Sequence, residues 1–261
     1  MRNLLACFVL LLLLSTCEST PPAGATAAPE ITADTVAKPT PAQALLARAV
    51  EAHGGDRYAT AHYGFVFRDK QYTFRNDGTR YRYTRTFTDE DGTVTHDVLD
   101  NGTLSRTVNE QPVKLSAKDE AKYRNALNSV IYFATLPHKL QDPAVNLVRA
   151  GRQTVKEATY DLLRVSFAEE GGGKDFEDNF IYWINQATGR IDYLAYDYRT
   201  DGGGVRFRAA YNPRVVDGIL FQDYVNYKAP VGTSLDVLAA QYAKGALEEL
   251  SRIETEEVTV R

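Results

Sequence analysis

The sequence has almost no cysteine, only Cys7 and Cys17 among 261 residues. Cys7 lies in an N-terminal apolar run of the kind that is removed on export, so the mature chain keeps at most one thiol. An intramolecular disulfide is therefore excluded. An unpaired cysteine in an exported chain needs another explanation, and acylation of Cys17 supplies one.

The sequence also lacks an apolar run long enough to cross a bilayer, which needs about 20 residues. Its longest run, at 4–14, follows a basic residue, as in a signal peptide. The letters LSTC that end at Cys17 resemble the bacterial lipobox, in which the cysteine is acylated, although that pattern prefers Gly or Ala in place of Thr16. We predict a signal peptide with a lipobox at 1–17. The alternative is ordinary secretion, with cleavage among the small residues at 23–25.

An excess of positive charge is absent, since 30 Lys and Arg stand against 34 Asp and Glu, a net charge of −4. A polyanion needs a concentrated positive field, so composition argues against a nucleic-acid partner. Arg80 and Arg82, and later Arg206 and Arg208, do alternate with aromatic residues, as in single-stranded nucleic-acid platforms. We interpret these arginines as a solvent-facing side whose long stems cover Tyr rings.

Motifs for common chemistry are missing as well. The four histidines, at 53, 62, 96 and 138, have no HExxH spacing and no paired cysteines beside them, which argues against zinc. There is no GxSxG elbow, and GGGK at 171–174 does not continue as a phosphate-binding loop. We predict no cofactor and no metal, and we interpret His53 as a structural residue that caps the last carbonyls of a helix.

Residues 18–40 are rich in Pro, Ala, Thr and Ser and show no usable hydrophobic period. Such a segment cannot bury enough apolar surface to fold, so we predict a disordered tether at 18–40. The remaining residues, 41–261, are enough for a sizeable core, and we predict that they form a single domain.

Helical periodicity appears at 41–53, at 116–136 and from about 233 to 242, with Ser116 and Pro137 as start and stop signals. Short alternating segments separated by Asp-Gly and Asn-Gly turns predict antiparallel hairpins elsewhere, and the last residues fit helix or strand. Parallel βαβ alternation is absent. We predict an α+β fold in which a curved antiparallel sheet forms a half-open β-barrel with helices covering one face.

The stretch FIYWINQATGRIDYLAYDY, residues 180–198, predicts a hairpin that is apolar on both faces. Phe180 and Tyr182 alternate with Ile181 and Trp183, so each side of the sheet must be covered. The helix at 116–136 would cover one side, and either closure of the curved sheet or a bound ligand would cover the other. A rolled sheet can enclose a ligand, and a filled core without a cavity is the alternative.

Several stretches resemble an uncharacterised family of lipoproteins from Bacteroidota, described as a domain of unknown function. They are AHGG at 52, YWINQATGRIDYLAYDY at 182, GGVRFRAAYNPRVVDGILFQDYVNYK at 203 and ALEELSRIE at 246. That family looks like a distant relative of the periplasmic lipoprotein carriers and receptors of the LolA/LolB type. The resemblance implies a half-open antiparallel barrel, lidded by helices over an apolar cavity. It transfers no functional residue, because no carrier motif matches this chain.

We predict a lipid-anchored binding protein on the periplasmic face of the outer membrane, which shelters an apolar or amphipathic ligand such as a lipid or lipidated peptide. Burial of methylene groups, at about 0.8 kcal/mol each, would drive binding. The predicted lining residues are Phe65, Phe67, Tyr72, Phe74, Trp183 and Tyr193. The alternatives are a periplasmic hydrolase that uses His53 or His62 with a carboxylate, and a scaffold that docks proteins on a face of Tyr and Arg.

Overall fold

The computed structural model describes residues 38–170, 177–199 and 202–261. The predicted signal peptide, Cys17 and nearly all of the tether predicted at 18–40 lie outside these residues. From Pro39 onward the chain forms one compact unit. No helix in the described ranges is long and apolar enough to cross a membrane.

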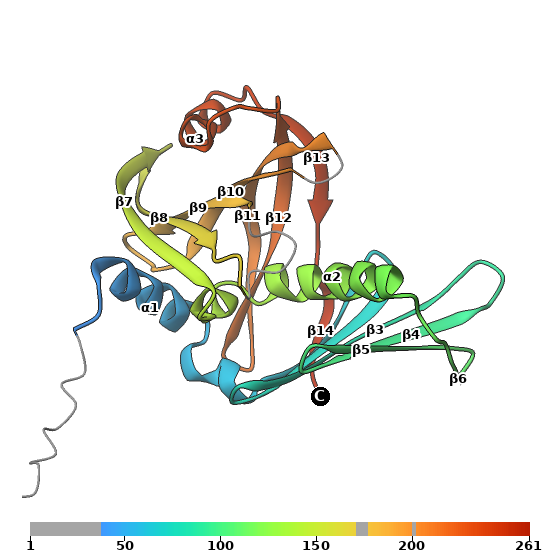
Figure 1. The fold of residues 1–261 in the computed structure, drawn as a ribbon. Helices are drawn as coiled ribbons and strands as arrows, with labels where there is room; N and C mark the ends of the chain where they lie inside the picture. The colour runs from blue at the N-terminus through green and yellow to red at the C-terminus, as the bar shows by residue number, and fades with distance from the viewer. Residues whose placement is uncertain (1–37, 171–176, 200–201) are drawn as a thin grey trace, which may run out of the picture. The chain divides into compact units, whose positions relative to one another are not determined.

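Two antiparallel sheets of seven strands each form the body of this unit (Figure 1). Sheet A consists, in pairing order, of β14 (Glu256–Val260), β1 (His62–Phe67), β2 (Lys70–Asp77), β3 (Arg80–Thr88), β4 (Val94–Asp100), β5 (Thr103–Val108) and β6 (Gln111–Pro112). Sheet B consists of β13 (Glu248–Ile253), β12 (Ile219–Ala229), β11 (Gly204–Val216), β10 (Ile191–Tyr198), β9 (Asn179–Asn185), β8 (Ala158–Phe167) and β7 (Val145–Val155). The helices are α1 (Pro41–His53), η1 (Gly55–Thr60), α2 (Ala117–Ala134), η2 (His138–Gln141) and α3 (Leu235–Ala243).

The strand order makes one open, curved surface out of the two sheets. Strands that pair are neighbours in the numbering, except that β14 returns to β1. Sheets A and B meet where β13 runs into β14, while β6 and β7 are the opposite edges and do not pair with each other. The predicted α+β class with an unclosed antiparallel sheet is therefore confirmed.

A buried carboxylate fastens the place where the two sheets meet. Asp223 on β12 accepts a hydrogen bond of 2.9 Å from the backbone N–H of Thr255, in the link between β13 and β14. Arg214 on β11 forms an ion pair of 3.1 Å with the same carboxylate and also donates to the carbonyl of Thr255. Side chains thus hold the link at the point where the ladder of backbone hydrogen bonds breaks.

The helices begin where the sequence predicts them. The side chains of Ser116 and Ser234 accept the backbone N–H groups of Asp119 and Asp236 and so cap α2 and α3. α2 lies across sheet A (Figure 1), where Leu127 and Ile131 are fully buried within the aromatic core of that sheet. The stretch at 116–136 is therefore a covering helix, as predicted, but it lies mainly over sheet A. It reaches the 180–198 hairpin, which it was predicted to cover, through its last turns, where the hydroxyl of Tyr132 lies 2.9 Å from that of Tyr182.

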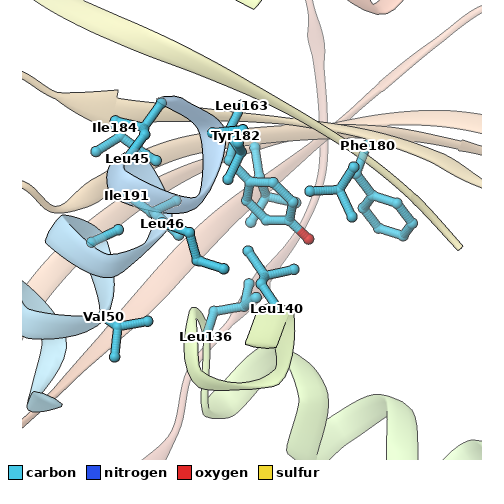
Figure 2. Close-up of a cluster of buried hydrophobic side chains, with 14 of the residues drawn as sticks. Leu45, Leu46, Val50, Leu136, Leu140, Leu163, Phe180, Tyr182, Ile184 and Ile191 are labelled. Carbon is cyan, nitrogen blue, oxygen red and sulfur yellow. The ribbon is translucent and has the colours of Figure 1, made fainter. Parts of the chain in front are cut away.

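The hairpin of β9 and β10 is buried on both faces, as its sequence predicts. Its inner face, which carries Phe180, Tyr182 and Ile184, packs against α1 and against the segment that follows α2 (Figure 2). Its outer face, which carries Ile181 and Trp183, packs under α3. The sequence predicted that either closure of the sheet or a ligand would cover this second face. A helix covers it instead, because α3 folds back onto the outer side of sheet B.

His53 has a different partner from the one its position in the helix predicts. Its Nε2 accepts a hydrogen bond of 3.1 Å from the backbone N–H of Ile191, so the prediction that it caps carbonyls of its own helix is wrong. Burial, with Arg190 nearby, lowers the pKa of His53 to about 4, which keeps the ring neutral and able to accept. The side chain joins the end of α1 to sheet B.

Candidate ligand-binding cavity

A cavity of about 210 Å³ lies between the C-terminal half of α2, the turn from β1 to β2, and the inner face of sheet B. α2 contributes Ser129, Val130, Phe133 and Ala134. The end of β1 contributes Phe67 and the turn after it contributes Arg68. Sheet B with its link contributes Arg208, Gln222, Tyr224, Asn226, Ile253 and Thr255. The cavity therefore stands where the two sheets meet, beside the helix that covers them.

The helical repeat of α2 explains why one of its sides borders the cavity. Residues one turn apart share a side of a helix, which places Val130 and Ala134 together. Leu127 and Ile131 fall on the neighbouring stripe and enter the core of sheet A. The same helix thus anchors itself through one stripe and walls the cavity with the next, so the wall is largely apolar.

Arg208 is the buried charged group of the cavity, since it is only 8% exposed. Its guanidinium carbon lies 3.9 Å from the ring centroid of Phe133, and one of its terminal nitrogens donates to the hydroxyl of Tyr196 at 2.9 Å. Its Nε has no hydrogen-bond partner. The interpretation of Arg208 as solvent-facing is therefore wrong, because its strand turns this side toward α2.

The alternation of β11 accounts for the position of Arg208. Val205 and Phe207 point to the outer face under α3, so Arg206 and Arg208 point to the inner face. Arg206 is partly exposed and donates to the hydroxyl of Tyr198 at 2.6 Å. Two neighbouring arginines of like chemistry thus differ in depth, and only Arg208 lines the cavity.

The polar floor of the cavity comes from β12. Gln222 donates to the hydroxyl of Tyr224 at 2.8 Å and to the carbonyl of Ile191 at 2.7 Å. Burial raises the pKa of Tyr224 to about 12, so this hydroxyl stays neutral. The amide nitrogen of Asn226 donates to the hydroxyl of Ser251, whereas its amide oxygen is buried without a partner. Among the residues that line the cavity, the Nε of Arg208 on β11 is the other buried polar atom without a hydrogen-bond partner.

The cavity carries positive charge and no compensating acid. Arg68 and Arg208 both line it, and no Asp or Glu is among its lining residues. In the part of the chain that the structure describes, neither arginine forms an ion pair. Arg68 is exposed, with its guanidinium carbon 5.0 Å from the ring centroid of Phe67. An anion inside would meet one buried and one exposed cation.

The structure separates the predicted lining residues into three places. Phe67 lines the cavity. Phe65, Tyr72 and Phe74 lie in the adjoining core of sheet A, under α2. Trp183 and Tyr193 belong to the cluster under α3, on the outer face of sheet B. The indole N–H of Trp183 donates to the side chain of Gln153 at 2.8 Å, which fixes it there.

Sequence reasoning missed Arg208, Phe133 and Val130 as lining residues. A usable signal was present, because Arg208 stands in the middle of a strand with apolar neighbours, where an unpaired charge is expensive. The apolar stripe of α2 at positions 130 and 134 is also visible in the sequence. Tertiary packing determines which face of sheet B turns toward α2. The alternation of residues along a strand shows only which side chains share a face, so it could not predict that Arg208 lines the cavity.

A second cavity, of about 270 Å³, borders the other side of α2. It contains Lys139, whose Nζ lies 4.8 Å from the ring centroid of Tyr81 and 4.9 Å from that of Tyr83. Burial lowers the pKa of Lys139, while the nearby Asp142 opposes that shift. Because this cavity contains both signs of charge, it selects less strongly for one kind of ligand.

Neither histidine of the hydrolase alternative meets a carboxylate. His53 has the backbone of Ile191 as its hydrogen-bond partner, and no carboxylate within the described residues bonds to His53 or His62. The described residues also contain no group of three or more His, Cys, Asp or Glu side chains that could hold a metal ion. The cavity beside α2 therefore stands as the candidate site.

Residues 55–255 match the model of a family of unknown function, DUF6503. The chain belongs to this family. A search of curated proteins by sequence gives no match.

Solved structures with a similar course of chain include a LolA superfamily protein from Nitrosomonas europaea, at 11% identity and a TM-score of 0.49, over 84% of this chain and 93% of that one. A putative outer membrane lipoprotein-sorting protein domain from Vibrio parahaemolyticus has 8% identity and a TM-score of 0.38, and the match covers 70% of this chain and 90% of that one. Lipoprotein LppX from Mycobacterium tuberculosis has 13% identity and a TM-score of 0.27, and the match covers 73% of this chain and 98% of that one. Likenesses this low carry no ligand over to DUF6503.

Proposed function

We propose that this DUF6503 protein is a binding protein that holds part of an apolar or amphipathic ligand, a lipid or a lipidated peptide, in the cavity beside α2. The observation that carries the proposal is the cavity itself, whose walls include Phe67, Val130, Phe133 and Ile253. Apolar walls with a few converging polar groups are the common form of a small-molecule site. Removing methylene groups from water, at about 0.8 kcal/mol each, supplies the driving force.

The volume of the cavity limits how much of a ligand it can hold. Its 210 Å³ is below the range of about 300–1,000 Å³ that is usual for pockets that enclose a whole small molecule. A ligand with a single hydrocarbon chain therefore fits better than one with two hydrocarbon chains side by side. We expect one end of the ligand to be held beside α2 while the remainder stays at the opening.

We further propose that the protein is a lipoprotein of the periplasmic face of the outer membrane. In this proposal, residues 1–17 are the signal peptide with its lipobox, acylation of Cys17 supplies the anchor, and residues 18–40 tether the domain at 41–261. The resemblance to Bacteroidota lipoproteins supports this arrangement. The intact mass of the protein purified from cell membranes measures the acyl groups directly, and a chain that still carries residues 1–17, or lacks any acyl group, would remove the anchor from the proposal.

The cavity is tested with the neutral fluorescent probe N-phenyl-1-naphthylamine on residues 17–261 carrying Cys17→Ser, the mature chain without its acyl group. The probe should bind and should be displaced by hexadecanol. Val130→Trp places an indole in the cavity, because Val130 lines it. We expect this variant to bind the probe at least roughly tenfold more weakly, the loss that about two buried methylene groups represent.

Ala126→Trp is the matched control, since Ala126 is an exposed residue one turn earlier on α2 and does not line the cavity. Its affinity for the probe should stay within about twofold of the parent. Absence of probe binding by the parent chain, or equal affinity in the Val130→Trp variant, would rule out this cavity as the binding site.

A further inference from the structure

We propose that the ligand of this cavity is a single-chain amphiphile with an anionic head, a carboxylate or a phosphate, and that Arg208 recognises the head. This inference rests on the proposed function and specifies the class of ligand. The geometry behind it is a buried guanidinium that lines an apolar cavity and keeps an unused N–H donor at Nε.

A buried charge without a partner is unfavourable, so its presence calls for an explanation. Two arginines are buried within the described residues, Arg85 and Arg208, each 8% exposed. Arg85 donates twice to the fully buried carboxylate of Asp97, so its charge is compensated within the fold. Arg208 has the phenol of Tyr196 and no acid. The fold compensates one buried arginine and leaves the other for a group that comes from outside.

The geometry around Arg208 suits an anionic head. A guanidinium presents its N–H groups in a planar fork that matches the oxygens of a carboxylate or phosphate. The ring of Phe133 lies against the guanidinium carbon and orients it, and one terminal nitrogen is held by Tyr196. The guanidinium N–H groups that Tyr196 does not accept remain to donate to the ligand. The amide donor of Gln222 is already used within the protein, so Arg208 is the group that selects for charge.

The other residues that line the cavity explain why the ligand should carry a hydrocarbon chain next to its anionic head. Apolar walls from Val130 and Phe67 stand beside the cation, so a methylene chain attached to the head would be buried next to it. Arg68 is exposed and unpaired, and its charge attracts the same anion from solvent. Because the lining includes no acid, a cationic head is disfavoured.

The test compares ligands with the same chain and different heads, each below its micellar concentration at pH 8. Hexadecanoate, hexadecyl phosphate and hexadecanol are measured by displacement of N-phenyl-1-naphthylamine. We expect at least one anion to bind roughly 10- to 100-fold more tightly than hexadecanol, the range of a charge-assisted hydrogen bond. The two anions distinguish a fatty acid from a phosphate-bearing lipid.

Arg208→Met should abolish the preference for anions and leave hexadecanol affinity within about threefold. Arg206→Met is the matched control, since Arg206 also bonds a tyrosine hydroxyl from the inner face of β11 but does not line the cavity. It should keep the preference. The ratio between anion and alcohol within one variant is insensitive to partial unfolding, because unfolding lowers both affinities equally.

The outcomes separate this inference from the proposed function. If the parent chain binds hexadecanol as tightly as both anions, or if Arg208→Met retains the anion preference, Arg208 is not the recognition group, while binding in the cavity stands. If none of the three ligands displaces the probe and the probe itself does not bind, the proposed function and this inference fail together.

Discussion

Charged residues in the interior of this protein are held in two different ways. The carboxylate of Asp97 is fully buried and accepts hydrogen bonds from both Arg85 and Arg106. Asp223 is similarly held by Arg214 and by the backbone of Thr255. These pairs are parts of the scaffold, since removal of either partner would leave an uncompensated charge. Arg208 differs because its removal strands no acid.

His53 makes stability depend on pH at the level of a single residue. Its pKa is lowered by burial, and to a smaller extent by Arg190, from 6.5 to about 4. The unfolded chain therefore binds more protons than the folded one between these values, and stability falls as pH drops from about 6.5 toward 4. Between pH 7.5 and 5.0 the contribution of His53 should fall by about 2 kcal/mol.

Urea unfolding at pH 7.5 and 5.0 measures this effect in the parent chain and in His53→Gln. The glutamine can still accept the N–H of Ile191 but does not titrate. The decrease in the free energy of unfolding on acidification should be smaller in the variant by about 2 kcal/mol. Equal decreases in both proteins would show that His53 does not sense pH.

At the scale of elements, α3 is the cover of the outer face of sheet B. Leu238 is fully buried in the cluster that contains Trp183, whereas Val237 is 43% exposed. Leu238→Ala should lower the free energy of unfolding by roughly 2–5 kcal/mol, the usual effect of truncating a buried leucine. Val237→Ala, its neighbour on the exposed side, should change it by less than about 0.5 kcal/mol.

The tryptophan of this chain is its only one, so its fluorescence reports on the same cluster. The Leu238→Ala substitution removes side-chain atoms next to Trp183 and should alter its emission in the folded protein. Val237→Ala should leave the emission unchanged. An unaltered spectrum together with an unaltered midpoint of unfolding would mean that α3 does not cover the hairpin of β9 and β10.

The elements themselves follow from the sequence, whereas their partners do not. Alternation at residues 180–198 was enough to predict a hairpin with both faces covered, and Ser116 was enough to predict the start of α2. Periodicity carries no information on which helix covers which face, so the place of α3 over Trp183 could not be predicted. The same limit applies to the cavity, where parity pairs Arg206 with Arg208 but does not tell which face turns toward α2.

At the scale of the whole molecule, the junction of the two sheets depends on Asp223. Asp223→Ala would leave the guanidinium of Arg214 and the N–H of Thr255 without this partner. Loss of one partner of a buried ion pair lowers stability by roughly 3–5 kcal/mol, and we expect this loss in urea unfolding. Glu256→Ala, at an exposed acid one residue beyond Thr255, is the control and should stay within about 0.5 kcal/mol.

Because Thr255 also lines the cavity, the Asp223→Ala protein should bind N-phenyl-1-naphthylamine more weakly even in the absence of urea. A variant that is destabilised but binds normally would show that the junction supports the fold without shaping the site. Unchanged stability of the Asp223→Ala variant would show that Asp223 does not stabilise the junction of the two sheets.

The pairing of β14 with β1 joins strands that lie far apart in the sequence, and the backbone N–H of Arg261 donates to the carbonyl of His62. Most other strands pair with a neighbour in the chain and close only short loops, whereas β1 and β14 close a loop that runs from Phe67 to Glu256. We therefore expect β1 and β14 to pair late in folding, and the part of the cavity wall that Ile253 and Thr255 provide, just before β14, to form with them.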